Sequence, residues 1–208
     1  MNIRRSMIAL TLALSAAAHA PAADVRQSKA PSPAQDVIAF WKEAGPALWF
    51  AKDPEFDARF RSRFVSLYEA AARRDLASWE RSPDGALALL ILLDQYPRNS
   101  FRGTPRMYAT DGLARQVANR AIEAGYDRMA PQELRVFFVL PLAHSEQMAD
   151  QERSVALARR LGPADVAHAE HHRDIVRRFG RFPHRNKILG RINTVEEQEY
   201  LDNGGYAG

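Results

Sequence analysis

Two segments of this chain are apolar on every side. Residues 86–93 contain only Ala, Leu and Ile, and residues 134–142 are apolar except for Arg135. A helix with apolar residues all around its surface must be enclosed by protein. We therefore expect these two segments to form helices at the centre of the domain, with the remaining helices packed around them.

The rest of the chain carries the start and stop signals of about eight helices. Asp53-Pro54 and Ser82-Pro83 each place a capping residue before a proline at the first helical position. Thr194 and Glu197 have the spacing of a capping box. No stretch alternates between apolar and polar residues as a strand would. The sequence predicts one all-α domain, residues 34–208, whose helices pack as hairpins.

The N-terminus has the pattern of a secretory signal peptide. Arg4 and Arg5 precede an uncharged stretch, residues 7–18, and small residues follow up to Ala23. We predict a signal peptide over residues 1–23, a flexible leader over 24–33, and a mature protein that is periplasmic or secreted. The uncharged stretch is too short to span a bilayer, so no membrane contact is expected after cleavage. Arg4-Arg5 also forms a weak twin-arginine pattern, which leaves the export route open.

Composition excludes several classes of protein. The 208 residues are 46% hydrophobic and 26% charged and include no cysteine, which excludes disulfide scaffolds and thiolate metal sites. Signal cleavage removes two of the 29 basic residues and none of the 25 acidic ones, leaving a net charge of +2. A nucleic-acid-binding protein is not expected at this charge, and no metal or other cofactor is predicted. All but four of the basic residues are arginines.

The placement of Asp94 predicts a buried ion pair. Asp94 directly follows the apolar segment 86–93, at the expected end of a helix. A carboxylate is disfavoured there by the helix dipole, and an unpaired buried charge is costly. Asp94 should therefore have a cationic partner, and the candidates in turn-rich segments are Arg98, Arg102, Arg181, Arg185 and Arg191.

Two segments of the chain resemble each other. Residues 96–103 and 182–190 both contain an aromatic residue and proline, then Arg-Asn, three further residues and glycine. Two such loops could hold one carboxylate or phosphate between their arginines. The predicted ligand-binding residues are Asp94, Gln95, Arg98, Asn99, Arg102, Arg181, Arg185, Asn186 and Arg191. The alternative is that each arginine caps helix carbonyls or pairs with Asp94 or Glu146, but five arginines exceed what two acids can neutralise.

Residues with acid–base chemistry follow the second apolar segment. His144, Glu146 and His184 are the catalytic candidates, provided that the fold brings them to one pocket. His144 and Ser145 are neighbours on a helix and so cannot face each other as a base and nucleophile. His168 and His172 have metal-ligand spacing, but a solvated histidine-rich face is the favoured interpretation. Trp41, Trp49 and Phe50 are expected to form core packing rather than a ligand wall.

These motifs, taken in order, resemble one bacterial family. They are Phe40-Trp41, Trp49–Asp53 with Phe56-Asp57, Leu93–Asn99 with Phe101-Arg102-Gly103, His144-Ser145-Glu146, Asp150–Ser154, His172-Arg173-Asp174, Phe179–Asn186 and Leu189-Gly190-Arg191. In that order the chain resembles the family called domain of unknown function 924, from about Val37 to Leu201. The resemblance implies an all-helical fold similar to tetratricopeptide repeats and no established activity. Family members usually lack an export signal, so the predicted signal peptide departs from their pattern.

Three interpretations of function remain open from the sequence. The first is a pocket that binds a small anionic ligand between the two Arg-Asn segments, and whether it is also an enzyme stays open. The second is a tetratricopeptide-like scaffold that binds a peptide or protein partner. The third is a satisfied polar network with a structural role only.

Overall fold

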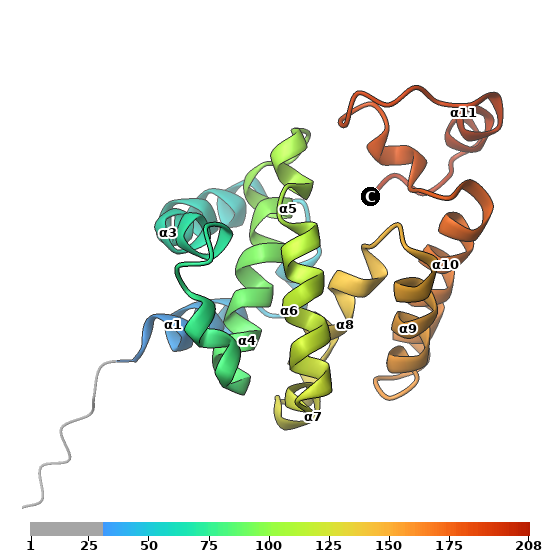
Figure 1. The fold of residues 1–208 in the computed structure, drawn as a ribbon. Helices are drawn as coiled ribbons and strands as arrows, with labels where there is room; N and C mark the ends of the chain where they lie inside the picture. Colours follow the sequence, from blue (N-terminus) through green and yellow to red (C-terminus); the bar gives the residue numbers. More distant parts are fainter. Residues whose placement is uncertain (1–30) are drawn as a thin grey trace, which may run out of the picture. The chain divides into compact units, whose positions relative to one another are not determined.

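The computed structural model describes residues 31–208, and the regular structure of these residues consists entirely of helices (Figure 1). Eight helices have eight or more residues: α1 (Pro33–Ala44), α3 (Pro54–Ala72), α4 (Pro83–Leu90), α6 (Asp111–Glu123), α8 (Val136–Ala143), α9 (Met148–Ala158), α10 (Pro163–Phe179) and α11 (Val195–Asp202). Three α-helices are single turns: α2 (Pro46–Trp49), α5 (Tyr96–Ser100) and α7 (Tyr126–Met129). The predicted all-α class is confirmed, and the predicted signal peptide lies outside the described residues.

Helix starts follow the local capping signals. Asp53 accepts a hydrogen bond from the Phe56 N–H at 2.8 Å, and Ser82 accepts one from the Gly85 N–H at 3.2 Å. Thr194 and Glu197 form the predicted capping box at the start of α11. Ser32 forms a further capping box with Gln35, so α1 begins at Pro33. The last residues of the predicted leader are therefore part of the folded domain.

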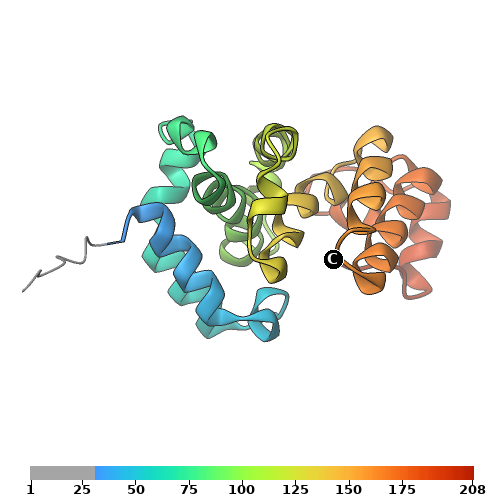
Figure 2. The same ribbon diagram turned by 90° about the horizontal axis from the view of Figure 1, so that it is seen from below.

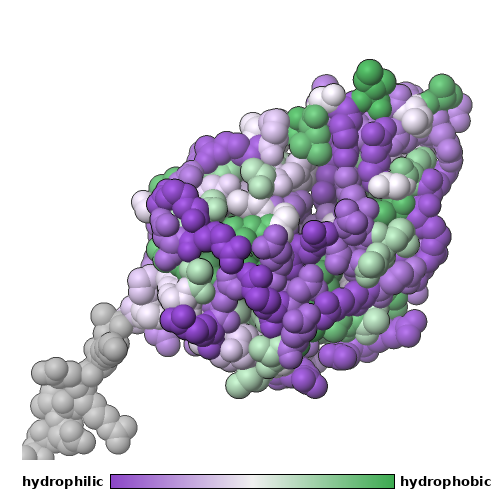
Figure 3. All heavy atoms as spheres, in the orientation of Figure 1, coloured by the Kyte–Doolittle hydropathy of each residue, from purple (hydrophilic) through white to green (hydrophobic). Residues whose placement is uncertain are grey.

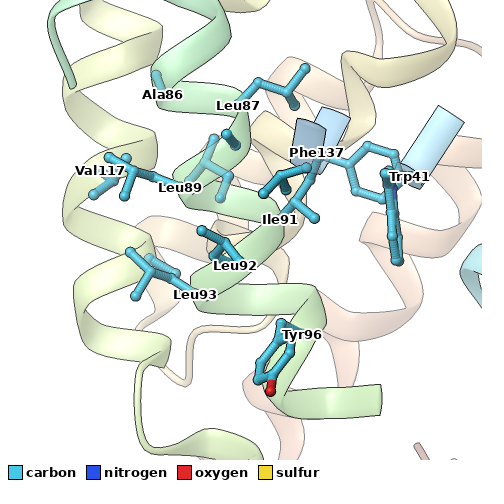
Figure 4. Close-up of a cluster of buried hydrophobic side chains, with 14 of the residues drawn as sticks. Trp41, Ala86, Leu87, Leu89, Ile91, Leu92, Leu93, Tyr96, Val117 and Phe137 are labelled. Carbon is cyan, nitrogen blue, oxygen red and sulfur yellow. The ribbon is translucent and has the colours of Figure 1, made fainter. Parts of the chain in front are cut away.

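The two all-apolar segments lie at the centre, as predicted. Leu90, Leu92 and Phe138 have no exposed surface. Trp41 of α1 packs edge-on against Phe137 of α8, with 5.4 Å between the ring centroids (Figure 4). Burying aromatic rings of this size supplies much of the hydrophobic stabilisation of a domain core.

The helix that contains the first apolar segment does not end at Asp94, which corrects the sequence-based expectation. After α4 the chain forms a π-helical turn, η2 (Ile91–Gln95), and passes directly into α5. Pro97 lacks an N–H and cannot donate to the Leu93 carbonyl, four residues earlier. The Thr110 hydroxyl donates to that carbonyl instead, at 2.6 Å. Asp94 is therefore held within a wide helical turn and not at a frayed end.

The second half of the protein is a series of helical hairpins. α8, α9 and α10 pack in chain order, α9 running antiparallel to both neighbours, so that α8 and α10 run in the same direction (Figures 1 and 2). The first half departs from this order, because α1 packs on α4 and α3 packs on α5. The chain ends beside α10, near the middle of the described unit (Figure 1).

The surface seen in Figure 3 is mainly hydrophilic, and its hydrophobic residues are scattered. Among residues 31–208, no helix combines the length and the hydropathy needed to cross a bilayer.

Candidate functional site

A cleft of about 730 Å³ opens beside α8 and α10. Val136, Leu140 and His144 line it from α8 and its C-cap, and Ala164, His168 and His172 line it from α10. Residues four apart lie on one face of a helix. Each helix therefore presents a single stripe to the cleft.

Asp94 pairs with His144, which lines this cleft. Asp94 has only 1% of its surface exposed, and its Oδ1 lies 2.8 Å from His144 Nδ1. Gln95 donates to the other carboxylate oxygen at 2.6 Å. Because an ionised carboxylate can only accept hydrogen bonds, Nδ1 carries the proton. The lone pair of His144 is then on Nε2, on the opposite side of the ring.

Arg98 keeps Asp94 ionised. Its Nη1 lies 3.2 Å from Asp94 Oδ1 and donates to the Asp94 carbonyl at 2.8 Å. Burial by itself would raise the pKa of the Asp94 carboxyl, but the Arg98 charge and the hydrogen bond with His144 hold that pKa below its usual range. Burial and the nearby Arg98 charge lower the pKa of His144. At neutral pH the pair is therefore a carboxylate and a neutral imidazole.

Arg98 and Arg185 meet at one carboxylate, that of Asp111. Arg98 binds Asp111 through two hydrogen bonds of 2.9 and 3.1 Å, and Arg185 Nη1 lies 3.3 Å from the same carboxylate. The Tyr108 ring faces both guanidiniums, with centroid distances of 5.9 Å to Arg98 and 4.7 Å to Arg185. The fold thus brings the two predicted arginines together, although they are not in two equivalent loops. Arg98 is on α5, and Arg185 ends the 3₁₀ turn η5 (Pro183–Arg185).

The buried guanidinium of Arg185 has few hydrogen-bond partners among the described residues. It is 6% exposed, and its Nε is buried without a hydrogen-bond partner among the described residues. The rings of Tyr108 and Phe182 lie on it, the Phe182 centroid at 4.5 Å. Burial and the Arg98 charge lower the pKa of the Arg185 guanidinium. A guanidinium has five N–H donors, and within residues 31–208 Arg185 makes one hydrogen bond, the long one to Asp111.

Three further histidines lie near this end. The His168 and His172 ring centroids are 4.2 Å apart, and His172 lies 6.2 Å from His144. His172 is 1% exposed, so the predicted solvated histidine face is wrong for this residue. Burial lowers the pKa of His172 to about 2 and that of His184 to about 3. Within the described residues no group of three side chains is arranged to hold a metal ion.

Tyr206 and Gly208 cover part of the histidine end. The Tyr206 ring packs against His172 and His184, with centroid distances of 4.9 and 5.0 Å. Both residues line the cleft. The last residues of the chain therefore contribute to the desolvation of these histidines.

The opposite part of the cleft has apolar walls, with Gln132, Glu133 and Asp165 also lining it. Trp49 is buried in the core and also lines the cleft, whereas Phe50 lines it with 62% of its surface exposed. Leu161 and Ala164, around the start of α10, also line the cleft, as do Val136 and Leu140 of α8. Trp49 and Phe50 thus form part of the cleft wall, and Trp49 also packs in the core. Trp41 packs in the core and does not line the cleft.

Several predicted site residues lie elsewhere. Glu146 forms a bidentate ion pair with Arg191, at 2.7 and 3.0 Å, and also accepts a hydrogen bond from the Phe182 N–H. Although burial raises the pKa of Glu146, these hydrogen bonds lower it overall. Arg181 pairs with Glu197 through two hydrogen bonds of 2.6 and 2.7 Å. These residues stabilise the C-terminal segment and do not line the cleft.

The two predicted asparagines are bound within the protein. Asn99 and Arg102 both bind Asp57, at 2.8 and 2.6 Å, although both also line the cleft. Asn186 donates to Asn193 at 2.7 Å. Ser145 donates to Asp150 at 2.7 Å and not to His144, in agreement with the expectation from helix geometry.

Sequence reasoning missed Asp111, Tyr108 and Tyr206. Asp111 begins α6 and is 74 residues from Arg185, so no local pattern indicates their contact. The acidic first turn of α6 was a usable signal for a helix start, but it carries no information about the arginines.

Comparison with known proteins identifies the family to which the chain belongs. The model of a bacterial protein family of unknown function, DUF924, matches residues 37–205. A solved structure of a protein of unknown function from Agrobacterium tumefaciens is 54% identical, with a TM-score of 0.81, over 82% of this chain and 97% of that one. No curated protein matches the chain significantly. The chain therefore belongs to the DUF924 family of bacterial proteins.

Proposed function

We propose that the protein binds a small anionic molecule in the cleft, with Arg185 and Arg98 as its anchors and His144 as an acid–base group. The observation that carries this proposal is the buried guanidinium of Arg185, which lines the cleft and whose Nε–H has no hydrogen-bond partner among the described residues. An anion that accepts hydrogen bonds from this guanidinium would offset its desolvation.

His144 has the features of a general base. Asp94 fixes its tautomer and orientation, and the ring lines the cleft with Nε2 as the free lone pair. A neutral imidazole held by a buried carboxylate is a common arrangement for proton abstraction. His184 lines the same cleft but lacks a carboxylate partner, so His144 is the stronger candidate.

Isothermal titration calorimetry with acetate and with inorganic phosphate tests the proposal. Arg185→Gln should weaken binding of the anion at least about tenfold, because removing one partner of a buried charged hydrogen bond costs about 2–5 kcal/mol. Arg177→Gln is the matched control, since Arg177 is exposed and pairs with Glu152 on the surface. Equal binding to both variants, or no binding of either anion to the unmodified protein, would contradict the proposal.

A peptide-binding scaffold is the second candidate. Tyr206 and Gly208 of the chain itself line the cleft. Because the cleft already accommodates a segment of polypeptide, this arrangement favours a peptide as ligand. A short peptide with a free C-terminal carboxylate should then bind more tightly than acetate, and its C-terminal amide should not bind.

We also propose that the mature protein works in the periplasm or outside the cell. This rests on the predicted signal peptide, residues 1–23. Mass spectrometry of protein from an osmotic-shock fraction should find an N-terminus near residue 24, whereas a cytoplasmic protein that begins at Met1 would contradict it.

A further inference from the structure

We infer that the ligand is a monocarboxylate with an elongated apolar body, bound with its carboxylate at Arg185 and its body along the α8 stripe. This inference rests on the proposed function and adds the class of ligand to it.

The cleft has two chemically different ends. Arg98, His144 and Arg185 are joined through Asp94 and Asp111 at one end. From His144 the α8 stripe continues through Leu140 to Val136. On α10 the corresponding stripe runs from His172 through His168 to Ala164. Because the two helices run in the same direction (Figure 1), the polar members of both stripes are at one end and the apolar members at the other.

The length of the stripe sets the size of the apolar body. Eight residues of α-helix separate Val136 from His144, which corresponds to about 12 Å along the axis. Phe50 and Trp49 add aromatic surface beside this stripe. An exposed aromatic ring at the mouth of a cleft, as Phe50 is, gains by packing against an apolar ligand.

The charges at the polar end favour a ligand with one negative charge over a ligand with two. Two guanidiniums, of Arg98 and Arg185, face two carboxylates, of Asp94 and Asp111, and the imidazole of His144 is neutral. The cluster is therefore close to neutral before a ligand arrives. Each negative charge of a ligand is therefore added to a neutral cluster. A carboxylate adds one charge and can accept a hydrogen bond from the unpartnered Nε–H of Arg185, whereas a phosphate dianion adds two charges.

The remote end disfavours a second negative charge. Glu133 and Asp165 both line the cleft near the N-terminal ends of the two stripes. Lys42 lies 4.0 Å from Glu133 in an exposed pair, and Asp165 has no ion pair within the described residues. A dicarboxylate of the same length would bring its second carboxylate toward these acids.

Calorimetry with four probes separates the possibilities: acetate, octanoate, its dicarboxylic counterpart suberate, and octanol. We expect octanoate to bind at least about tenfold more tightly than acetate, because additional methylene groups are buried. Octanoate should also bind more tightly than suberate and octanol. Phe50→Ser should weaken the binding of octanoate several-fold and leave the binding of acetate unchanged. Met129→Ser is the matched control, because Met129 is an exposed apolar residue away from the cleft.

The outcomes distinguish this inference from the proposed function. If acetate binds in an Arg185-dependent manner and octanoate binds no more tightly, the inference of an elongated apolar ligand is wrong, and the proposed anion site is still supported. If suberate binds as tightly as octanoate, the single negative charge is wrong. If octanol binds as tightly as octanoate, or octanoate binding survives Arg185→Gln, the anion site itself is wrong.

Discussion

His144 and Asp94 are 50 residues apart in the chain, and their side chains meet at 2.8 Å. The contact joins the two apolar central segments, since Asp94 follows the first and His144 follows the second. Arg98 binds the same carboxylate oxygen at 3.2 Å. A single buried carboxylate oxygen of Asp94 therefore contacts both the His144 imidazole and the Arg98 guanidinium.

Replacing Asp94 should be strongly destabilising. Asp94→Ala leaves the Arg98 guanidinium and His144 Nδ1–H without their buried acceptor, which should lower the free energy of unfolding by about 3–5 kcal/mol. Asp36→Ala is the control, because Asp36 pairs with Arg63 at the surface and its loss should cost at most about 1 kcal/mol. Urea denaturation measures both, and similar small losses would show that the Asp94 pair is not a structural element.

Arg98 and Arg185 should respond differently to the same substitution. Arg98→Met leaves Asp94 and Asp111 without their main cationic partner and should cost about 3–5 kcal/mol. Arg185→Met removes a buried charge that makes one long hydrogen bond, so stability should stay within about 1 kcal/mol or increase. A large loss in Arg185→Met would favour a purely structural network over a ligand site.

Stability should decrease as the pH falls below about 6.5. Burial lowers the pKa of His172 to about 2 and of His184 to about 3. Above pH 6.5 both the folded and the unfolded chain hold these histidines neutral. Below that pH the unfolded chain binds protons that the folded chain excludes, so each histidine lowers the free energy of unfolding by up to about 1.4 kcal/mol per pH unit.

Urea denaturation at about pH 7, 6 and 5 measures this dependence. His172→Gln should reduce the slope, and His171→Gln, at an exposed position on the same helix, should leave it unchanged. A flat profile between pH 7 and 5 would show that these histidines are hydrated in the folded protein.

Removing the Tyr206 ring should raise the histidine pKa values. Tyr206 packs on His172 and His184, and its loss admits water to both imidazoles. NMR titration of Tyr206→Ala should find the pKa of each shifted upward, toward the ordinary value of about 6.5. Tyr206→Phe keeps the ring and should leave both pKa values unchanged, so equal shifts in the two variants would point to a cause other than desolvation.

Local rules in the sequence were sufficient for the helical class and for the centre of the domain. Capping at Asp53, Ser82 and Thr194 depends on neighbours three residues away, so these helix starts were predicted correctly. The burial of residues 86–93 and 134–142 follows from composition, since an all-apolar helix has no face suited to water. The continuation past Asp94 was missed because Thr110, 17 residues away from Leu93, supplies the donor that Pro97 lacks.

The site depended on contacts that no spacing in the sequence specifies. Asp94 was correctly predicted to need a cationic partner, because burying a charge carries a cost wherever the partner comes from. The identity of each partner was decided by tertiary structure. Of the five candidate arginines, only Arg98 binds Asp94 in the described structure.

The sequence-based expectation that five arginines outnumber their acidic partners was also wrong. Asp57, Asp111 and Glu197 join Asp94 and Glu146 as partners of these arginines. The sequence by itself determined which residues form helices and which must be buried, because both follow from local hydrogen bonding and hydropathy. Only the tertiary structure decided which charges meet, and that the Arg185 Nε–H is buried at a cleft without a partner among the described residues, because ion pairs form between side chains that are distant in the chain.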